Sequence, residues 1–419
     1  MKAPKQIVIS HVYSRDNKGD AVLTSVLIAD LKRKYPDAHI SILALQPGRG
    51  KFEGCKEYPS FMSFVLTNSL HPLTKLTRML YMIPVTLLWA AGLAYAGRQF
   101  WLPNQLQITA QLYAQADLVV PVGGGHIRSQ KGTMGLFNVL LLLHPLWFGV
   151  ILKKPTILYS QSIGPFRNRF ENQLAALTLK RMTLILLRED TSMELLKNIG
   201  VRNNIMRSID SGFLHVSNKK VNLRKLYNIA SDELIIGVTV RAWLDKIGQA
   251  AYEKAVAKTL DTILDTVHAR VIFIPQVTAG KGDDDRTISR RVFKLMKRQD
   301  TAIVIENEPD HHEIKALYDN LDILLGTRFH SVIFSLTSHV PVMAIEYEHK
   351  TSGIMHDLEL DQWVMKIEAV SEVELTEKMM KLINEKHIYK QLLRKRLPAY
   401  IKQARQTVDL LDQAYQQAP

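Results

Sequence analysis

Apolar and polar positions along the chain form two kinds of segment. Short runs rich in β-branched apolar residues predict buried strands, and longer segments with apolar positions every three or four residues predict helices. The predicted strands are 6–10, 38–45, 118–122, 155–160, 184–187, 234–240, 271–275, 302–305, 323–325 and 342–345. The predicted helices are 19–35, 168–182, 191–200, 249–267, 285–298, 311–321 and 330–338. Because strands and helices alternate, we expect α/β architecture with parallel sheets that carry helices on both faces.

The alternation breaks once, in the polar stretch 217–231, and a new strand follows it. We therefore expect two doubly wound, Rossmann-like domains, residues 1–217 and 218–372, facing across a cleft. Residues 373–419 are helical in pattern and basic, and we expect them to pack across the domains. Sheets of this class bind ligands beyond the carboxyl ends of their strands.

Residues 79–97 form an apolar stretch without a charged side chain, interrupted by Pro84. Its length reaches the lower range for a membrane span. We expect a buried helix, with a helix lying on a membrane surface as the main alternative and a true span as the less favoured one. The aromatic residues Tyr81, Trp89, Tyr95 and Trp101 are of the types enriched at membrane interfaces. A second apolar run, 136–152, predicts a core helix.

The net charge and the cysteine content limit the classes of ligand and of protein that fit this sequence. The 419 residues include 54 Lys and Arg against 40 Asp and Glu, a net charge of +14, which attracts anions such as phosphorylated metabolites, anionic lipid or nucleic acid. The single cysteine, Cys55, excludes an intramolecular disulfide and a Cys-rich zinc module. The first apolar run is too short for a secretory signal. We therefore expect a cytoplasmic protein without a metal site.

The candidate site residues of the first domain follow predicted strands. They are Asn17, Gly19, Asp20, Gly123, Gly124, Gly125, Ser162 and Arg188. A glycine at a strand-to-helix turn permits close approach of a ligand, and helix N-termini favour anions. The alternatives are a capped turn at Asn17, a simple tight turn at the glycines, and a structural ion pair of Arg188 with Glu189 or Asp190.

The second domain carries the stronger candidates. Arg241 follows the first strand of this domain, where a planar guanidinium can grip a carboxylate or phosphate. Arg328 and His330 lie two residues apart between an apolar strand and an apolar helix, and His330 can transfer a proton near neutral pH. The alternative is a helix cap with a buried histidine. Lys350 follows the strand 342–345 and is either a second phosphate-binding cation or a solvated loop charge. Because these cations fall at strand ends, we favour a small-ligand site over nucleic-acid binding.

Taken in order, these segments resemble the polysaccharide pyruvyl transferase family. The resemblance spans roughly residues 7–360. Its motifs are Asn17-x-Gly19-Asp20, Gly123-Gly124-Gly125, Ser162-Ile163-Gly164-Pro165, Arg188-Glu189, Arg241, Pro275-Gln276, Leu325-Gly326-Thr327-Arg328-Phe329-His330, and Pro341-Val342 through Tyr347 to Lys350.

The resemblance implies a GT-B type of fold and a transferase that moves the pyruvyl group of phosphoenolpyruvate onto sugar hydroxyls, as a ketal, with release of phosphate. It identifies Arg328 and His330 with the family's Arg-x-His pair, Lys350 with its downstream lysine, and Arg241 with its donor-binding arginine. Arg188 would be another basic position. Two features depart from the family: Phe329 replaces the usual leucine, and 79–97 is an apolar insertion.

The chemical properties of these residues fit this reaction independently of the resemblance. Arg241, Arg328 and Lys350 match the carboxylate and phosphate of phosphoenolpyruvate. His330 is the candidate acid that protonates C3, and Asp20 the candidate acceptor of the hydroxyl proton. No cofactor is needed beyond phosphoenolpyruvate as co-substrate.

We expect the acceptor to be a saccharide of a cell-surface polysaccharide or a lipid-linked precursor, reached at the inner face of the membrane through 79–97. The rival is a GT-B glycosyltransferase with a nucleotide-sugar donor, for which Glu346 is a poorly placed ribose ligand.

Overall fold

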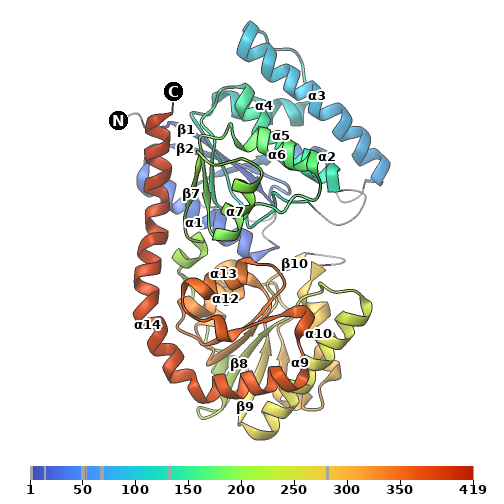
Figure 1. The fold of residues 1–419 in the computed structure, drawn as a ribbon, viewed down its shortest axis with the longest axis vertical. Helices are drawn as coiled ribbons and strands as arrows, with labels where there is room; N and C mark the ends of the chain where they lie inside the picture. The colour runs from blue at the N-terminus through green and yellow to red at the C-terminus, as the bar shows by residue number, and fades with distance from the viewer. Residues whose placement is uncertain are drawn as a thin grey trace. The chain divides into compact units, whose positions relative to one another are not determined.

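The computed structural model describes residues 3–13, 16–48, 52, 54–66, 70–129, 135–279 and 283–418. The chain forms two compact units (Figure 1). Unit 1 comprises Met1–Arg15, Leu23–Ser211 and Gln403–Pro419, and unit 2 comprises Asp16–Val22 and Gly212–Lys402. The division after Ser211 lies close to the predicted boundary at 217. The sequence pattern did not indicate that Asp16–Val22 belongs with the second unit.

Unit 1 contains parallel strands that form one continuous row. The strands are β1 (Gln6–Val12), β2 (His39–Ala44), β3 (Lys56–Pro59), β4 (Leu118–Pro121), β5 (Ile157–Gln161), β6 (Leu184–Leu187) and β7 (Ile205–Arg207). Their order is β3-β2-β1-β4 in one sheet and β5-β6-β7 in another. Parallel bridges from Val119 to Thr156 and from Val122 to Tyr159 join β4 to β5, so the order reverses between β1 and β4.

The helices of unit 1 cover both faces of this row. They are α1 (Lys18–Lys34), whose first turn belongs to unit 2, α2 (Phe61–Val65), α3 (Pro72–Ala96), α4 (Asn104–Gln115), α5 (Gly135–Ile151), α6 (Arg169–Leu179) and α7 (Asp190–Asn198). One core cluster joins Leu27 and Leu31 of α1 to Val408 and Leu411. A second cluster joins Trp89 of α3 to residues of α2, α4 and α5.

Helix α3 is buried on one face only. Met79, Met82, Thr86, Trp89 and Ala90 are buried, in a helix that begins with Pro at its first position and ends at the left-handed Gly97. Its other face carries large exposed apolar side chains, with Leu80 61% and Leu88 64% exposed. The prediction of a buried helix is therefore wrong for this face. Within the described part of the chain, α3 alone has the length and apolar composition of a membrane span.

Unit 2 is built on a six-stranded parallel sheet with the order β12-β9-β8-β13-β14-β15. The strands are β8 (Leu234–Thr239), β9 (Ala269–Phe273), β12 (Ala302–Val304), β13 (Ile323–Gly326), β14 (Val342–Glu346) and β15 (Val364–Lys366). A small antiparallel pair, β10 (Thr278–Ala279) and β11 (Asp283–Asp284), lies outside the sheet. Because β8 pairs with both β9 and β13, the order reverses between β8 and β13.

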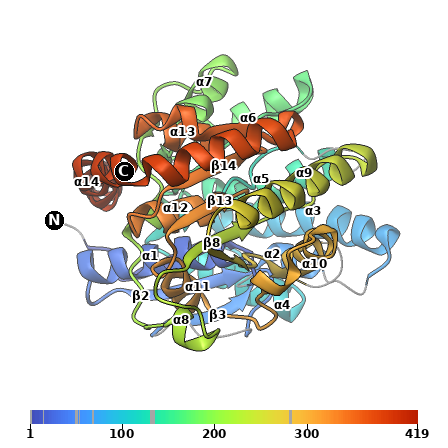
Figure 2. The ribbon, with the colours of Figure 1, turned by 90° about the horizontal axis from the view of Figure 1, so that it is seen from below.

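Helices flank this second sheet on both faces (Figure 2). They are α8 (Leu223–Leu226), α9 (Lys246–Thr266), α10 (Asp285–Leu295), α11 (His311–Tyr318), α12 (Phe329–Thr337) and α13 (Lys350–Asp357). Helix α14 (Glu372–Gln417) contributes residues up to Lys402 to unit 2 and the remainder to unit 1.

Candidate active site

The predicted cations of unit 2 follow three neighbouring strands. Arg241 comes after β8, Arg328 after β13, and Lys350 after β14. These strands are parallel and adjacent, so their carboxyl ends meet at one edge of the sheet. The strand order reverses between β8 and β13, which is where open α/β sheets form a ligand-binding crevice.

Arg241 packs against two aromatic rings that also contact each other. Its guanidinium carbon lies 4.2 Å from the ring centroid of Tyr347 and 4.9 Å from that of Trp243. Within the described residues, its Nε atom is buried without a hydrogen-bond partner, and no carboxylate forms an ion pair with it. Cation–π contacts orient a cation without neutralising it. Arg241 therefore keeps its hydrogen-bonding capacity for an anion.

A buried glutamine shapes the loop that carries Arg241. The Oε1 atom of Gln249 accepts hydrogen bonds from the backbone of Trp243, at 2.9 Å, and of Leu244, at 3.3 Å. Its Nε2 atom donates to the carbonyl of Arg241 and to Glu253, which pairs with Arg291. Gln249 thereby fixes the backbone on both sides of the guanidinium.

Lys350 lies beside the same aromatic group. Its Nζ atom is 5.2 Å from the Phe329 ring, 5.7 Å from the Tyr347 ring, and 2.9 Å from a carboxylate oxygen of Glu348. Burial acts to raise the pKa of Tyr347, but Lys350 and Arg241 outweigh it, and the net pKa is lowered. This phenol therefore lies in a positive electrostatic environment.

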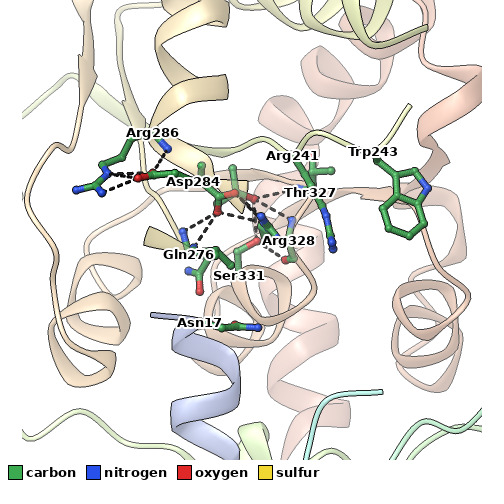
Figure 3. A network of polar contacts seen from close by, with 12 residues as sticks. Asn17, Arg241, Trp243, Gln276, Asp284, Arg286, Thr327, Arg328 and Ser331 are labelled. Carbon is green, nitrogen blue, oxygen red and sulfur yellow. Dashed lines mark hydrogen bonds and ion pairs between the residues drawn. The ribbon is translucent and has the colours of Figure 1, made fainter. Parts of the chain in front are cut away.

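Arg328 is in a different situation, because it is buried and paired. Its Nε atom lies 3.0 and 3.1 Å from the two carboxylate oxygens of Asp285. The same carboxylate accepts hydrogen bonds from the backbone of Gln276 and Val277. Figure 3 shows this network, with Gln276 on one side of Arg328 and Arg241 on the other. Arg328 thus ties the end of β13 to the loop after β9, and its predicted catalytic role stays a prediction.

The turn at Asn17 lies within unit 2, close to His330. Asn17 Oδ1 accepts a hydrogen bond from Gly19, and its Nδ2 donates to Asp20 at 2.9 Å, so the capped turn is present. The backbone of Lys18 donates to the carbonyl of Gln276. A Cβ atom on Gly19 would lie 1.9 Å from Nδ1 of His330, so only glycine leaves room for this ring. The turn therefore packs against the His330 ring. Figure 3 shows Asn17 below Gln276 and Ser331.

The candidates of unit 1 form a separate group. Gly123–Gly125 follow β4, at the reversal of that unit's strand order, and Gly125 has a φ of +110°. Arg188, fully buried, donates from Nε to Ser162, from Nη2 to the Gly124 carbonyl, and from Nη1 to Asp210 at 2.5 Å. Arg188 is therefore paired as the structural alternative proposed, but with Asp210 instead of Glu189 or Asp190. A substrate-binding role for Arg188 or Ser162 stays a prediction.

Sequence patterns assigned no role to the residues that support these cations. Tyr347, Trp243, Gln249 and Asp285 carry the contacts described above. Two aromatic residues near the cations in sequence were the available signal: Trp243, two positions after Arg241, and Tyr347, three positions before Lys350. Among the residues that the structure describes, no three or more His, Cys, Asp or Glu side chains are grouped so that they could hold a metal ion. A cavity of about 720 Å³ in unit 1, lined by Lys154 and Arg181 among others, contains none of the predicted site residues.

Comparison of the sequence with known proteins identifies a family and a curated relative. The family model described as polysaccharide pyruvyl transferase matches residues 17–349. The amylovoran biosynthesis protein AmsJ of Erwinia amylovora is 24% identical over 367 residues, which cover 84% of this chain and 86% of that protein.

Solved structures show the fold. A UDP-GlcNAc 2-epimerase from Neisseria meningitidis aligns with a TM-score of 0.61 at 10% identity, over 97% of this chain and 99% of that one. A glycosyltransferase from Rickettsia africae aligns with a TM-score of 0.59 at 14% identity, over 99% of this chain and 98% of that one. The S. aureus MnaA structure with UDP has a TM-score of 0.60 at 10% identity, over 97% and 95%. The predicted fold class, α/β of the GT-B type with a C-terminal helix, is confirmed.

Proposed function

The chain belongs to the polysaccharide pyruvyl transferase family, a family of transferases that act in polysaccharide biosynthesis, and from this premise we propose its reaction. The protein transfers the pyruvyl group of phosphoenolpyruvate to hydroxyls of a sugar, as a ketal, and releases phosphate. The donor assignment rests on the environment of Arg241. Its guanidinium stands at the strand-order reversal, oriented by two rings and with no ion pair among the residues described.

Phosphoenolpyruvate suits this edge of the sheet because it carries a carboxylate and a phosphate on adjacent atoms. Arg241 and Lys350, on strands separated only by β13, supply two cations for two anionic groups. The planar guanidinium matches either group with two parallel hydrogen bonds. Arg328 contributes positive charge from β13 while it holds Asp285.

The proposed reaction begins with proton transfer from His330 to C3 of the enol. C2 becomes electrophilic, and the first acceptor hydroxyl attacks it while its proton passes to Asp20. The C2–O bond to phosphate then breaks, and the electron pair leaves with the phosphate. The second hydroxyl closes the ketal, and its proton ends on the released phosphate. The cations stabilise the charge that develops on the departing phosphate.

The test is a thermal-shift titration with phosphoenolpyruvate, because a ligand that binds the native state raises its melting temperature. We expect a shift in the wild type and its loss in Arg241→Ala. Arg290→Ala is the matched control, because this arginine of unit 2 forms an exposed ion pair with Glu306. An equal shift in wild type and Arg241→Ala would refute the donor site.

The same titration examines the glycosyltransferase alternative by including UDP-GlcNAc. A shift with UDP-GlcNAc and none with phosphoenolpyruvate would favour that alternative. The solved structures described above share only 10–14% identity with this chain, so their similarity shows the fold alone. Glu346, the earlier candidate for a ribose ligand, accepts a hydrogen bond from the backbone of Ser352 at the start of α13. Its carboxylate is thus engaged in the loop after β14.

We propose further that the acceptor is attached to a membrane lipid and that α3 contacts the membrane surface. Leu73, Leu80, Leu88 and Tyr95 are 66%, 61%, 64% and 71% exposed. Their spacing of seven and eight residues places them on one helix face. Figure 1 shows α3 at the rim of unit 1, beside α4 and α5.

Charge favours an anionic bilayer as the surface that α3 contacts. From Tyr58 to Phe170 the sequence contains one acidic residue, Asp117, and nine lysine or arginine residues. Lys153 lies with its Nζ atom 5.1 Å from the Tyr95 ring, at the end of the exposed stripe. An apolar helix face with cations nearby binds anionic membranes both by burying apolar side chains and by electrostatic attraction to the lipid headgroups.

Vesicle flotation tests this contact. We expect the protein to float with vesicles of phosphatidylcholine and phosphatidylglycerol, less with phosphatidylcholine alone, and the double variant Leu80→Gln/Leu88→Gln to stay in solution. Leu177→Gln, an equally exposed leucine of α6, is the control. A wild type that floats with neither vesicle would refute membrane contact and leave the donor assignment intact.

A further inference from the structure

Tyr347 is the residue on which the cations of unit 2 converge. It follows β14, and its ring lies 4.9 Å from Trp243, 4.2 Å from the guanidinium carbon of Arg241 and 5.7 Å from Nζ of Lys350. The cations come from the ends of two different strands, and both lie against the Tyr347 ring. The reaction proposed above gives this side chain no role.

The electrostatics set Tyr347 apart from the other tyrosines near this edge. Tyr252 donates or accepts a hydrogen bond with Thr327, and burial raises its pKa, as burial also raises that of Tyr318. Burial acts on Tyr347 in the same direction, but Lys350, Arg241 and, more weakly, Arg328 lower its pKa against the opposing charge of Glu348. The phenol can therefore lose a proton more easily than an ordinary tyrosine.

We propose that Tyr347 is an acid–base residue that serves the departing phosphate. The inference rests on the proposed pyruvyl transfer and adds a residue to it. A phenol beside two cations can give up its proton because Arg241 and Lys350 stabilise the phenolate that remains. Phosphate departs more easily when its bridging oxygen receives a proton as the C–O bond breaks.

The step balances as follows. The Tyr347 hydroxyl gives its proton to the bridging oxygen of the phosphate attached to C2. The C2–O bond breaks, its electron pair stays on that oxygen, and hydrogen phosphate leaves. The second acceptor hydroxyl forms its bond to C2 and gives its proton to the Tyr347 phenolate. The tyrosine returns to its starting state, and no oxidant or cofactor is consumed.

The experiment compares wild type with Tyr347→Phe, which keeps the ring and removes only the hydroxyl. Phosphate release is measured with phosphoenolpyruvate and a panel of p-nitrophenyl hexosides, and donor binding by thermal shift. We expect the variant to keep its response to phosphoenolpyruvate and to lose about 100-fold or more in phosphate release, the scale of general acid–base catalysis. Tyr227→Phe, outside this cluster, is the control.

A second readout separates proton transfer from a structural role. The ultraviolet difference between wild type and Tyr347→Phe, followed against pH without substrate, should show a phenolate forming below the usual tyrosine pKa of about 10. Phosphate release in Tyr347→Phe should also lose a pH limb that the wild type has.

Three results would overturn the inference. They are unchanged phosphate release in the variant, loss of its donor response together with its activity, and a phenol that titrates at or above the usual pKa. If the wild type itself neither binds phosphoenolpyruvate nor releases phosphate, the proposed function fails first and the inference with it.

Discussion

The two units share a strand order and differ in what stands at its reversal point. In unit 1 the arginine near this point, Arg188, is fully buried and paired with Asp210. In unit 2 Arg241 packs on Trp243 and Tyr347 and makes no ion pair among the residues described. An arginine at a strand end is therefore not by itself a ligand site. Its partners decide whether its charge holds the fold or remains available to an anion.

The largest expected effect tests the unit 1 side of this comparison. Replacing Arg188 with alanine leaves the Asp210 carboxylate buried without its partner, which typically costs about 3–5 kcal/mol. We expect a large loss in the free energy of unfolding, measured by urea denaturation. The double variant Arg188→Met/Asp210→Leu removes both charges and should recover much of the loss. If Arg188→Ala unfolds at the wild-type urea concentration, the structural role is wrong.

Acid should weaken the protein through buried histidines, two of which lie in unit 1. Burial lowers the pKa of His11 to about 4 and of His144 to about 3, and in unit 2 it lowers that of His215 to about 3. Below the unfolded-state pKa of about 6.5, the unfolded chain binds protons that the native protein does not, so stability falls as the pH falls from about 6.5 toward 4.

His144→Met isolates one of these groups, because Thr86 can keep its hydrogen bond to the carbonyl of Met82. We expect the dependence of the unfolding free energy on pH to decrease by about 1.4 kcal/mol per pH unit, the contribution of one proton. Urea denaturation between pH 7 and 4.5 measures it. The exposed His387→Gln is the control, and an unchanged slope in His144→Met would contradict the assignment.

A smaller effect is expected from Gly19→Ala. Alanine normally favours a helix over glycine by about 1 kcal/mol. Here its methyl group would overlap the His330 ring, so we expect a loss of about 1–3 kcal/mol and at least 10-fold lower phosphate release. Gly248→Ala, whose Cβ would meet nothing closer than 3.3 Å, is the matched control and should be neutral or stabilising. Equal behaviour of the two variants would count against the His330 contact.

The smallest effect on stability is expected at Arg241 itself. Because Arg241 has no ion pair among the described residues, Arg241→Ala should change the unfolding free energy by less than about 1 kcal/mol, the scale of its cation–π contacts. Urea denaturation beside Arg188→Ala gives the comparison directly. A loss as large as that of Arg188→Ala would mean that both arginines hold the fold.

The fold was predictable where strands are buried on both faces. Each predicted strand is present. All of them except the edge strand β12 are central, and a central parallel strand reads as an apolar run. Of the strands that were missed, β3, β7 and β15 lie at the edges of their sheets and are partly exposed. The other two, β10 and β11, form the two-residue antiparallel pair outside the sheets. Helix α4 was also missed, although its buried residues Leu106, Thr109, Ala110 and Tyr113 follow the spacing of one helix face.

The placement of the candidate site residues was predictable as far as strand ends determine it. The pattern placed Arg241, Arg328 and Lys350 after strands, and parallel pairing brings strand ends together. It gave no information on Asp285 as the partner of Arg328 or on Asp210 as the partner of Arg188. Those pairs join distant segments, and the carboxylates carry no local signal that distinguishes them from surface residues.

The division of the chain also bears on how the protein forms during synthesis. The core of unit 1 includes Val408, Leu411 and Tyr415, and the His330 contact of unit 2 needs Gly19. A ribosome that has produced residues 1–211 has therefore made a domain without part of its core. We expect such a nascent chain to need protection from aggregation until α14 emerges, and neither unit to fold fully when it is expressed alone.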